Sequence, residues 1–158
     1  MTEDQQKFMR MAIALAKSGM KAGNGGPFGC VIVKDGIVIG QGSNMVLRTN
    51  DPTAHAEVVA IRDACKNLNN FQLEGCEVYT SCEPCPMCLG AIFWARPARF
   101  FYACTKEDAA DAGFDDDFIY QEIKLGPSKR KIPMFTLLRE ESMKVFEFWK
   151  EKGDKTLY

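Results

Sequence analysis

The sequence has little histidine, little net charge and no long apolar run. Its 158 residues include one histidine, and 20 basic residues nearly balance 21 acidic ones, for a formal net charge of -1. This balance gives no overall electrostatic reason to expect nucleic acid as a partner. No apolar run approaches the length of a transmembrane helix, and residues 1–10 are polar, unlike a secretion signal. We therefore expect a cytoplasmic protein without a membrane partner.

Cysteine is present in an odd number. Seven cysteines occur without a secretion signal, so disulfide bonds are not expected. Two of them form a Cys-x-x-Cys pair, Cys85 and Cys88. Four others lie in apolar stretches and are predicted to be small core residues: Cys30, Cys65, Cys76 and Cys104.

Turn and capping signals alternate with apolar runs along the chain. Asp35-Gly36 between two β-rich runs predicts a hairpin, and Pro86 predicts the start of a helix that carries both paired cysteines. Other helices are expected to begin at a capping box of Thr2 and Gln5 and at an N-cap of Thr53. Further strands are predicted at 78–80, 99–104 and 134–138. The length suits a single domain spanning 1–158, with an α/β fold. We expect a three-layer α/β/α sandwich around a mixed five-stranded sheet.

One imidazole, one carboxylate and two thiols form the most informative pattern. His55 is followed two residues later by Glu57, and Cys85 and Cys88 follow in the run Pro84-Cys85-Pro86-Met87-Cys88. Imidazole and thiolate ligands suit zinc, and three protein ligands leave the fourth tetrahedral position open, as in catalytic zinc sites. Zinc with an open position activates water, and Glu57 is placed to carry the proton. We predict one zinc ion per subunit, held by His55, Cys85 and Cys88, with Glu57 as the catalytic residue.

Two simpler interpretations of the Cys-x-x-Cys pair are open. It could be a thioredoxin-like redox pair, or half of a structural zinc site in a binding module. A structural site needs a fourth protein ligand, for which Cys82 is the nearest candidate. Such a module would not need the carboxylate of Glu57, so Glu57 favours the catalytic interpretation.

These residues resemble the cytidine deaminase superfamily, whose signature is His-x-Glu followed by Pro-Cys-x-x-Cys. More narrowly, the chain resembles the bacterial guanine deaminases over nearly its whole length. The resemblance implies a cytidine deaminase-like fold and hydrolytic deamination of guanine to xanthine and ammonia, in purine catabolism or salvage. It rests on residues 25–29 (GGPFG), 50–57 (NDPTAHAE), 81–92 (SCEPCPMCLGAI), 112–116 (AGFDD) and the terminal Tyr158.

The resemblance also implies contacts to the purine from Asn44, Asp116 and Tyr158, and Ala56 is a further predicted substrate-binding residue. It further implies a homodimer in which the segment from about 133 to 158 is exchanged between subunits. Tyr158 would then complete the partner's site. The sequence leaves open whether this segment is exchanged or folds back.

The chemistry of guanine agrees with two of these positions. Its N1–H and 2-amino groups are adjacent donors, which one carboxylate, such as that of Asp116, accepts together. The Asn44 amide can donate and accept at once, which suits the mixed edge of a purine. Phe28 and Trp94 are candidates to stack on the base.

A different deaminase substrate is the main alternative. Enzymes that convert adenosine to inosine in transfer RNA share His-Ala-Glu and Pro-Cys-x-x-Cys, but they need a basic surface for phosphates. The one dense basic run is Ser128–Lys131, which we interpret as a solvated loop. Guanosine, another purine or an aminotriazine are further candidate substrates.

Overall fold

The computed structural model describes all residues from Met1 to Tyr158 and divides them into two compact units, residues 1–116 and 117–158. The first unit contains the whole sheet and five helices: α1 (Glu3–Lys21), α2 (Val46–Thr49), α3 (Ala56–Leu68), α4 (Pro86–Ala95) and α5 (Lys106–Asp111). The second unit contains α6 (Asp117–Lys124), the 3-10 helix η1 (Pro127–Lys129) and α7 (Arg139–Glu151). None of the helices is both long and apolar enough to span a membrane.

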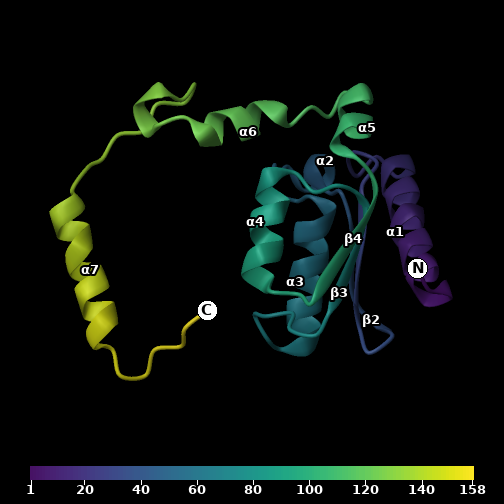
Figure 1. The fold of residues 1–158 in the computed structure, drawn as a ribbon, viewed down its shortest axis with the longest axis horizontal. Helices are drawn as coiled ribbons and strands as arrows, with labels where there is room; N and C mark the ends of the chain where they lie inside the picture. The colour runs from purple at the N-terminus through teal and green to yellow at the C-terminus, as the bar shows by residue number, and fades with distance from the viewer. The chain divides into compact units, whose positions relative to one another are not determined.

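A four-stranded mixed sheet forms the centre of the first unit (Figure 1). The strand order is β2-β1-β3-β4, with β1 antiparallel to both neighbours and β3 parallel to β4. The predicted hairpin joins β1 to β2 through Asp35 and Gly36, whose φ angles of 49° and 78° suit a type I′ turn. The strands are β1 (Gly29–Lys34), β2 (Ile37–Ser43), β3 (Glu77–Cys82) and β4 (Arg99–Cys104).

The predicted fifth strand, residues 134–138, does not form, so the five-stranded sheet was wrong. A strand requires a ladder of backbone hydrogen bonds to a neighbour, and apolar residues alone do not supply one. Here Met134 donates its backbone N–H to Pro127 O at 3.3 Å, a turn contact within the second unit. The apolar side chains that suggested a strand are exposed, with Phe135 at 86%.

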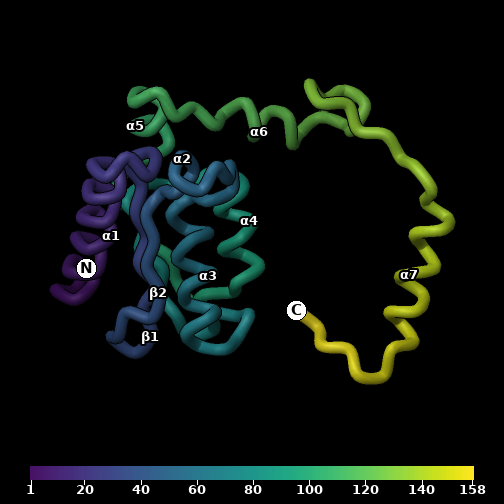
Figure 2. The backbone as a smooth tube through the Cα atoms, turned by 180° about the vertical axis from the view of Figure 1, so that it is seen from behind, coloured from purple at the N-terminus to yellow at the C-terminus, as the bar shows by residue number.

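Helices cover both faces of the sheet, which confirms the three-layer sandwich. On one face α1 buries Phe8 and Ala12 against a cluster that includes Val31 and Tyr79. On the other face lie α3 and α4 (Figures 1 and 2). The second core cluster fills that side and contains Cys30, Ile32, Ala56, Ala60, Ala64, Leu73, Cys76, Val78 and Ala95.

Close contact between α3 and β2 fixes the height of α3 above the sheet. A Cβ on Gly42 would lie 2.6 Å from Ala56 O and 2.8 Å from Ala60 N, so only glycine fits there. Ala56 is the first residue of α3. The beginning of this helix is therefore set by a backbone contact with the strand and not by long side chains.

Two local predictions at helix starts had different outcomes. The capping box of Thr2 and Gln5 is present at α1. Thr53 is not the N-cap of α3, and its backbone N–H and its hydroxyl both donate to Asp51 Oδ1, at 2.8 and 2.7 Å. His55 takes the N-cap position instead.

The four cysteines predicted to be core residues also had different outcomes. Cys30 and Cys76 are fully buried, and Cys65 is half-buried against the core, broadly as predicted. Cys104 is exposed, which contradicts its prediction as a core residue. It lies at the end of β4, the edge strand of the four-stranded sheet, where one side of the strand has no neighbour.

Candidate active site

The start of α3 positions the imidazole and the carboxylate. His55 has extended backbone angles at the N-cap, and Glu57 lies in the first turn of the helix. Glu57 is 5% exposed, and Thr80 on β3 donates its hydroxyl to Glu57 Oε1 at 3.1 Å. A carboxylate is thus held inside the protein next to a half-buried imidazole.

The start of α4 supplies the two thiols. Cys85 is its N-cap, Pro86 fixes the backbone of the first turn, and Cys88 follows one turn later, fully buried. His55 Nδ1 lies 3.5 Å from both sulfur atoms, and the three candidate ligand atoms all lie within 4.8 Å of one another. In a tetrahedral zinc site with bond lengths of roughly 2.0–2.3 Å, nitrogen and sulfur ligands are about 3.6 Å apart. The spacing and the donor set therefore fit zinc.

The two thiols have opposite acidities. Hydrogen bonds from Cys88 and His55 lower the pKa of Cys85 to about 4, against its burial. The pKa of Cys88 is raised by its hydrogen bond to Cys85, by burial and by the charge of Glu57. Opposite shifts of this kind are those of two thiols that share one proton. A bound cation favours the thiolate form of both, because metal ligation removes the remaining proton.

The acid–base groups are tuned by their surroundings. Burial raises the pKa of Glu57, and hydrogen bonds from Cys88 and Thr80 oppose that shift. The hydrogen bond to Cys85 raises the pKa of His55, with a small contribution from the charge of Asp116. A buried carboxylate with a raised pKa suits a group that both accepts and returns a proton.

Cys82, the candidate fourth ligand, is not part of the cluster. The group of side chains that could hold a metal ion consists of His55, Cys85 and Cys88. Cys82 donates its thiol to Thr105 O at 3.4 Å, and burial raises its pKa to about 11. A closed structural zinc site is therefore not supported, and the contact of both thiols with one imidazole favours a metal centre over a redox pair.

The predicted substrate-binding residues differ from one another in burial. Asn44 is 6% exposed at the end of β2, and Ala56 is fully buried at the start of α3. Asp116 is half-buried, and burial followed by the charge of Cys85 raises its pKa. Phe28 packs edge-on against Phe114, with ring centroids 4.9 Å apart.

Two aromatic candidates are exposed. Trp94 on α4 is 64% exposed, and Tyr158, in the second unit, is 68% exposed. The structure thus brings the zinc ligands and Glu57 together, while contacts of the other residues with a purine stay predictions.

Thr80 was missed by the sequence reasoning. Its hydroxyl contacts Glu57 across 23 residues of chain. A threonine in a strand is ordinary by itself, so the available signal was its alternation: Val78 and Thr80 lie on one face of β3, and Val78 packs into the cluster beneath α3.

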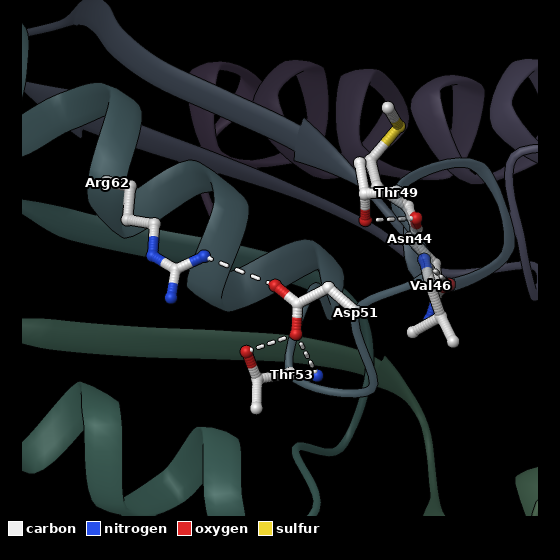
Figure 3. Close-up of polar contacts among 7 residues, drawn as sticks. Asn44, Val46, Thr49, Asp51, Thr53 and Arg62 are labelled. Carbon is white, nitrogen blue, oxygen red and sulfur yellow. Dashed lines mark hydrogen bonds and ion pairs between the residues drawn. The ribbon is translucent and has the colours of Figure 1, made fainter.

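A loop with its own hydrogen bonds leads from Asn44 to His55 (Figure 3). Asp51 receives both bonds from Thr53 and lies 3.8 Å from the Arg62 guanidinium on α3. The hydrogen bonds from Thr53 lower the pKa of Asp51, so the carboxylate is ionised at neutral pH. This arrangement shapes the chain immediately before His55.

Comparison with known proteins agrees with this site. Residues 2–104 match the family described as "Cytidine and deoxycytidylate deaminase zinc-binding region". The chain is 54% identical to guanine deaminase of Bacillus subtilis over 98% of its own length and 99% of the relative's. The chain belongs to the guanine deaminase branch of the cytidine deaminase superfamily.

Solved structures agree with this assignment. The crystal structure of Bacillus subtilis guanine deaminase superposes with a TM-score of 0.95 at 53% identity, covering 100% of this chain and 99% of the other. That of Nitrosomonas europaea guanine deaminase has a TM-score of 0.66 at 28% identity, with 92% and 84% covered. The tRNA-specific adenosine deaminase of Aquifex aeolicus is 40% identical, but over 63% of this chain and 65% of the relative.

Zinc content tests the ligand set of this deaminase. Purified Cys85→Ser and Cys88→Ser are expected to bind far less than the roughly one zinc ion per chain of the parent, because serine is a poor zinc ligand. Atomic absorption after dialysis measures this. Cys104→Ser, an exposed cysteine outside the cluster, should keep its zinc. Full zinc in both ligand variants would contradict the assignment.

Proposed function

We propose that this protein hydrolyses guanine to xanthine and ammonia in a zinc-dependent reaction. The observation that carries this conclusion is the near-full-length match to a guanine deaminase, together with a three-ligand metal cluster beside a buried carboxylate. A role in purine catabolism or salvage and a cytoplasmic location accompany this proposal as predictions from the sequence.

His55, Cys85 and Cys88 would hold the zinc. The ion supplies Lewis-acid activation of water, which lowers the pKa of that water toward neutrality. The chain offers three ligand atoms, and Cys82 donates its thiol elsewhere, so a bound zinc ion would be left with a position for water. The geometry of this donor set supports a catalytic site and not a structural one.

Glu57 moves the protons. In its ionised form it takes a proton from the attacking water and delivers it to a ring nitrogen. It then takes the second proton, from the new hydroxyl on C2, and delivers it to the departing ammonia. Burial raises its pKa, which brings both forms within reach, while the Thr80 hydrogen bond holds Oε1 in one orientation. Loss of ammonia from C2 then leaves xanthine.

The remaining residues are proposed to bind the base. Asp116 accepts from the N1–H and 2-amino groups of guanine, and Asn44 contacts another edge. Electrostatic coupling of Asp116 to His55 and Cys85 supports its proximity to the metal cluster. Ala56, fully buried beside His55, and Phe28, which packs against Phe114, are proposed to lie next to the base, in preference to Trp94, which is 64% exposed.

Transfer RNA is a weaker candidate substrate. Several adenosine deaminases acting on it match about two thirds to three quarters of this chain at 36–40% identity, such as 37% over 74% of the chain for Haemophilus influenzae, and one matches 90% of the chain at 35%. The net charge of -1 and the single dense basic run, Ser128–Lys131, do not favour a polyanion. Tight, salt-sensitive binding of an anticodon stem would favour this alternative.

We further propose a homodimer in which the segment from about 133 to 158 is exchanged. The apolar side chains of this segment are exposed within the chain, among them Phe135, Leu137, Phe148 and Leu157, each at least 72% exposed. Exposed apolar area on this scale is typical of a surface that packs against another chain. In that arrangement Tyr158 would reach the partner's site.

The first test measures ammonia release by zinc-loaded protein from guanine, guanosine, adenine, cytosine and an adenosine-containing anticodon stem. Guanine is expected to be the preferred substrate. Glu57→Gln should lower kcat by roughly 10²–10⁴-fold because it removes the proton carrier, while zinc content stays that of the parent. No release from guanine by zinc-loaded parent protein would refute the proposed reaction.

The hydrogen bond from Thr80 predicts a pH effect. Thr80→Val removes a donor that lowers the pKa of Glu57, so that pKa rises further. Because Glu57 must be ionised to accept a proton, the acid limb of the kcat/KM profile should move to higher pH, by up to about one unit. Thr80→Ser keeps the hydroxyl and should keep the parent profile. An identical profile for Thr80→Val would exclude this role.

Complementation tests the exchanged segment. Co-expressed Glu57→Gln and Tyr158→Ala chains carry different tags, so that mixed dimers can be purified. If Tyr158 serves the partner's site, each mixed dimer has one intact site and recovers about half of the parent activity. If the segment folds back, every site carries one defect and the mixture stays as inactive as the separate variants.

A further inference from the structure

The glycine-rich loop lies directly against the side chain of Asn44. A Cβ built on Gly25 would lie 2.0 Å from Asn44 Oδ1, 3.0 Å from its Cγ and 3.2 Å from its backbone oxygen. The φ of Gly25 lies outside the left-handed region, so its backbone could be adopted by other residues. A larger residue at position 25 is therefore excluded by lack of space and not by the backbone conformation. The side chain of Asn44, a proposed substrate-binding residue, fills that space.

The orientation of the Asn44 amide is determined by the backbone. Asn44 Oδ1 accepts the N–H of Val46, the first residue of α2, at 3.1 Å (Figure 3). An N–H at a helix start needs an acceptor, and only the oxygen of an amide can serve, so the NH₂ group must face the other way. The Oδ1 atom is enclosed between this N–H and the loop at Gly25.

The Asn44 NH₂ group is left available. It has no hydrogen-bond partner within the chain, and no side-chain nitrogen or oxygen is both fully buried and unpaired, so this nitrogen is reachable from outside. The residue itself is 6% exposed. A nearly buried donor that is still accessible is a group to which a ligand can bind.

The backbone around Asn44 is tied to the metal cluster. Asn44 N–H donates to Phe28 O at 3.0 Å, and the next residue, Met45, donates to Ala54 O at 2.9 Å. Ala54 immediately precedes His55. Backbone hydrogen bonds therefore connect the segment that carries the Asn44 amide to the residue before His55. A shift of the loop at Gly25 would move the Asn44 amide relative to His55.

We propose that Gly25 is a specificity-determining positioning residue that holds the Asn44 amide as a donor only. Because it has no side chain, Oδ1 keeps its bond to Val46, and Asn44 offers N–H groups alone to the substrate. The site then requires a hydrogen-bond acceptor, a ring nitrogen or a carbonyl oxygen, on the edge of the base facing Asn44. This narrows the earlier expectation that the amide both donates and accepts, and it rests on the proposed function for the identity of the base.

A double-mutant cycle on guanine turnover tests whether Gly25 acts through Asn44. Gly25→Ala is expected to lower kcat/KM by roughly 10–100-fold, since a misplacement of about 1 Å in a site has effects of this size. Zinc content should not change. In an Asn44→Ala background the obstructed oxygen is gone, so the same substitution should cost less than about threefold. Parent-like turnover of Gly25→Ala, or equal losses in both backgrounds, would overturn the proposal.

Asn44→Asp tests the donor-only role. Aspartate keeps an acceptor for the Val46 N–H but has no N–H to donate. Its kcat/KM should fall at least as far as that of Asn44→Ala. If Asn44→Asp were much more active than Asn44→Ala, the substrate would be bound by a side-chain oxygen at position 44, and the proposal would be wrong.

A readout independent of turnover separates this proposal from the proposed reaction. In a ¹⁵N-labelled sample, the side-chain NH₂ signals of Asn44 are identified by their loss in Asn44→Asp. They should shift in Gly25→Ala and stay in place in Gly90→Ala, where an exposed glycine of α4 would gain a Cβ with nothing within 4 Å. Unchanged signals in Gly25→Ala refute the positioning role, whereas a parent protein inactive on guanine refutes only the reaction.

Discussion

Two helix N-termini must meet so that one imidazole and two thiols come within 4.8 Å, and the first unit is arranged around that requirement. His55 and Cys85 are both N-caps, so each ligand precedes its helix and is held by the helix's first turn. The height of α3 is set by its backbone contact with β2 at Gly42. Because α3 and α4 lie on the same face of the sheet, small changes in either would separate the ligands.

The starts of α3 and α4 also bring ionisable groups together in a buried place, where the charged form of each group is costly. Glu57 is 5% exposed and interacts with Cys85 and Cys88, two thiols that share one proton. Such a group is tolerated when it is hydrogen-bonded and when a cation balances it. Thr80 supplies the hydrogen bond, and a zinc ion would supply the positive charge. Burial and neighbouring ionisable groups destabilise the folded protein here, and the same two features shift the pKa values toward those that acid–base catalysis needs.

Sequence reasoning succeeded where the signal was local. The Asp35-Gly36 turn, the cap at Thr2 and the proline at the start of α4 each depend on neighbouring residues, and each prediction is confirmed. It failed where a distant partner decides the outcome. The segment 134–138 has the composition of a strand but no ladder, and Thr53 bonds to Asp51 while His55 takes the N-cap position. The role of Thr80 follows only from the packing of α3 on β3, which brings its hydroxyl to Glu57.

The zinc chemistry and the choice of base reside in different parts of the chain. The superfamily match ends at residue 104, after both helix starts that carry the metal ligands and Glu57. The tRNA-specific adenosine deaminase of Aquifex aeolicus matches 63% of the chain, whereas a guanine deaminase matches 98%. A shared metal centre therefore cannot by itself distinguish a free purine from a nucleotide in RNA. That distinction must come from groups that contact the base, the role proposed above for the Asp116 carboxylate and for the Asn44 amide beside Gly25. Donors and acceptors held in one orientation reject a wrong base strongly, because a mismatch leaves a nearly buried polar group unpaired.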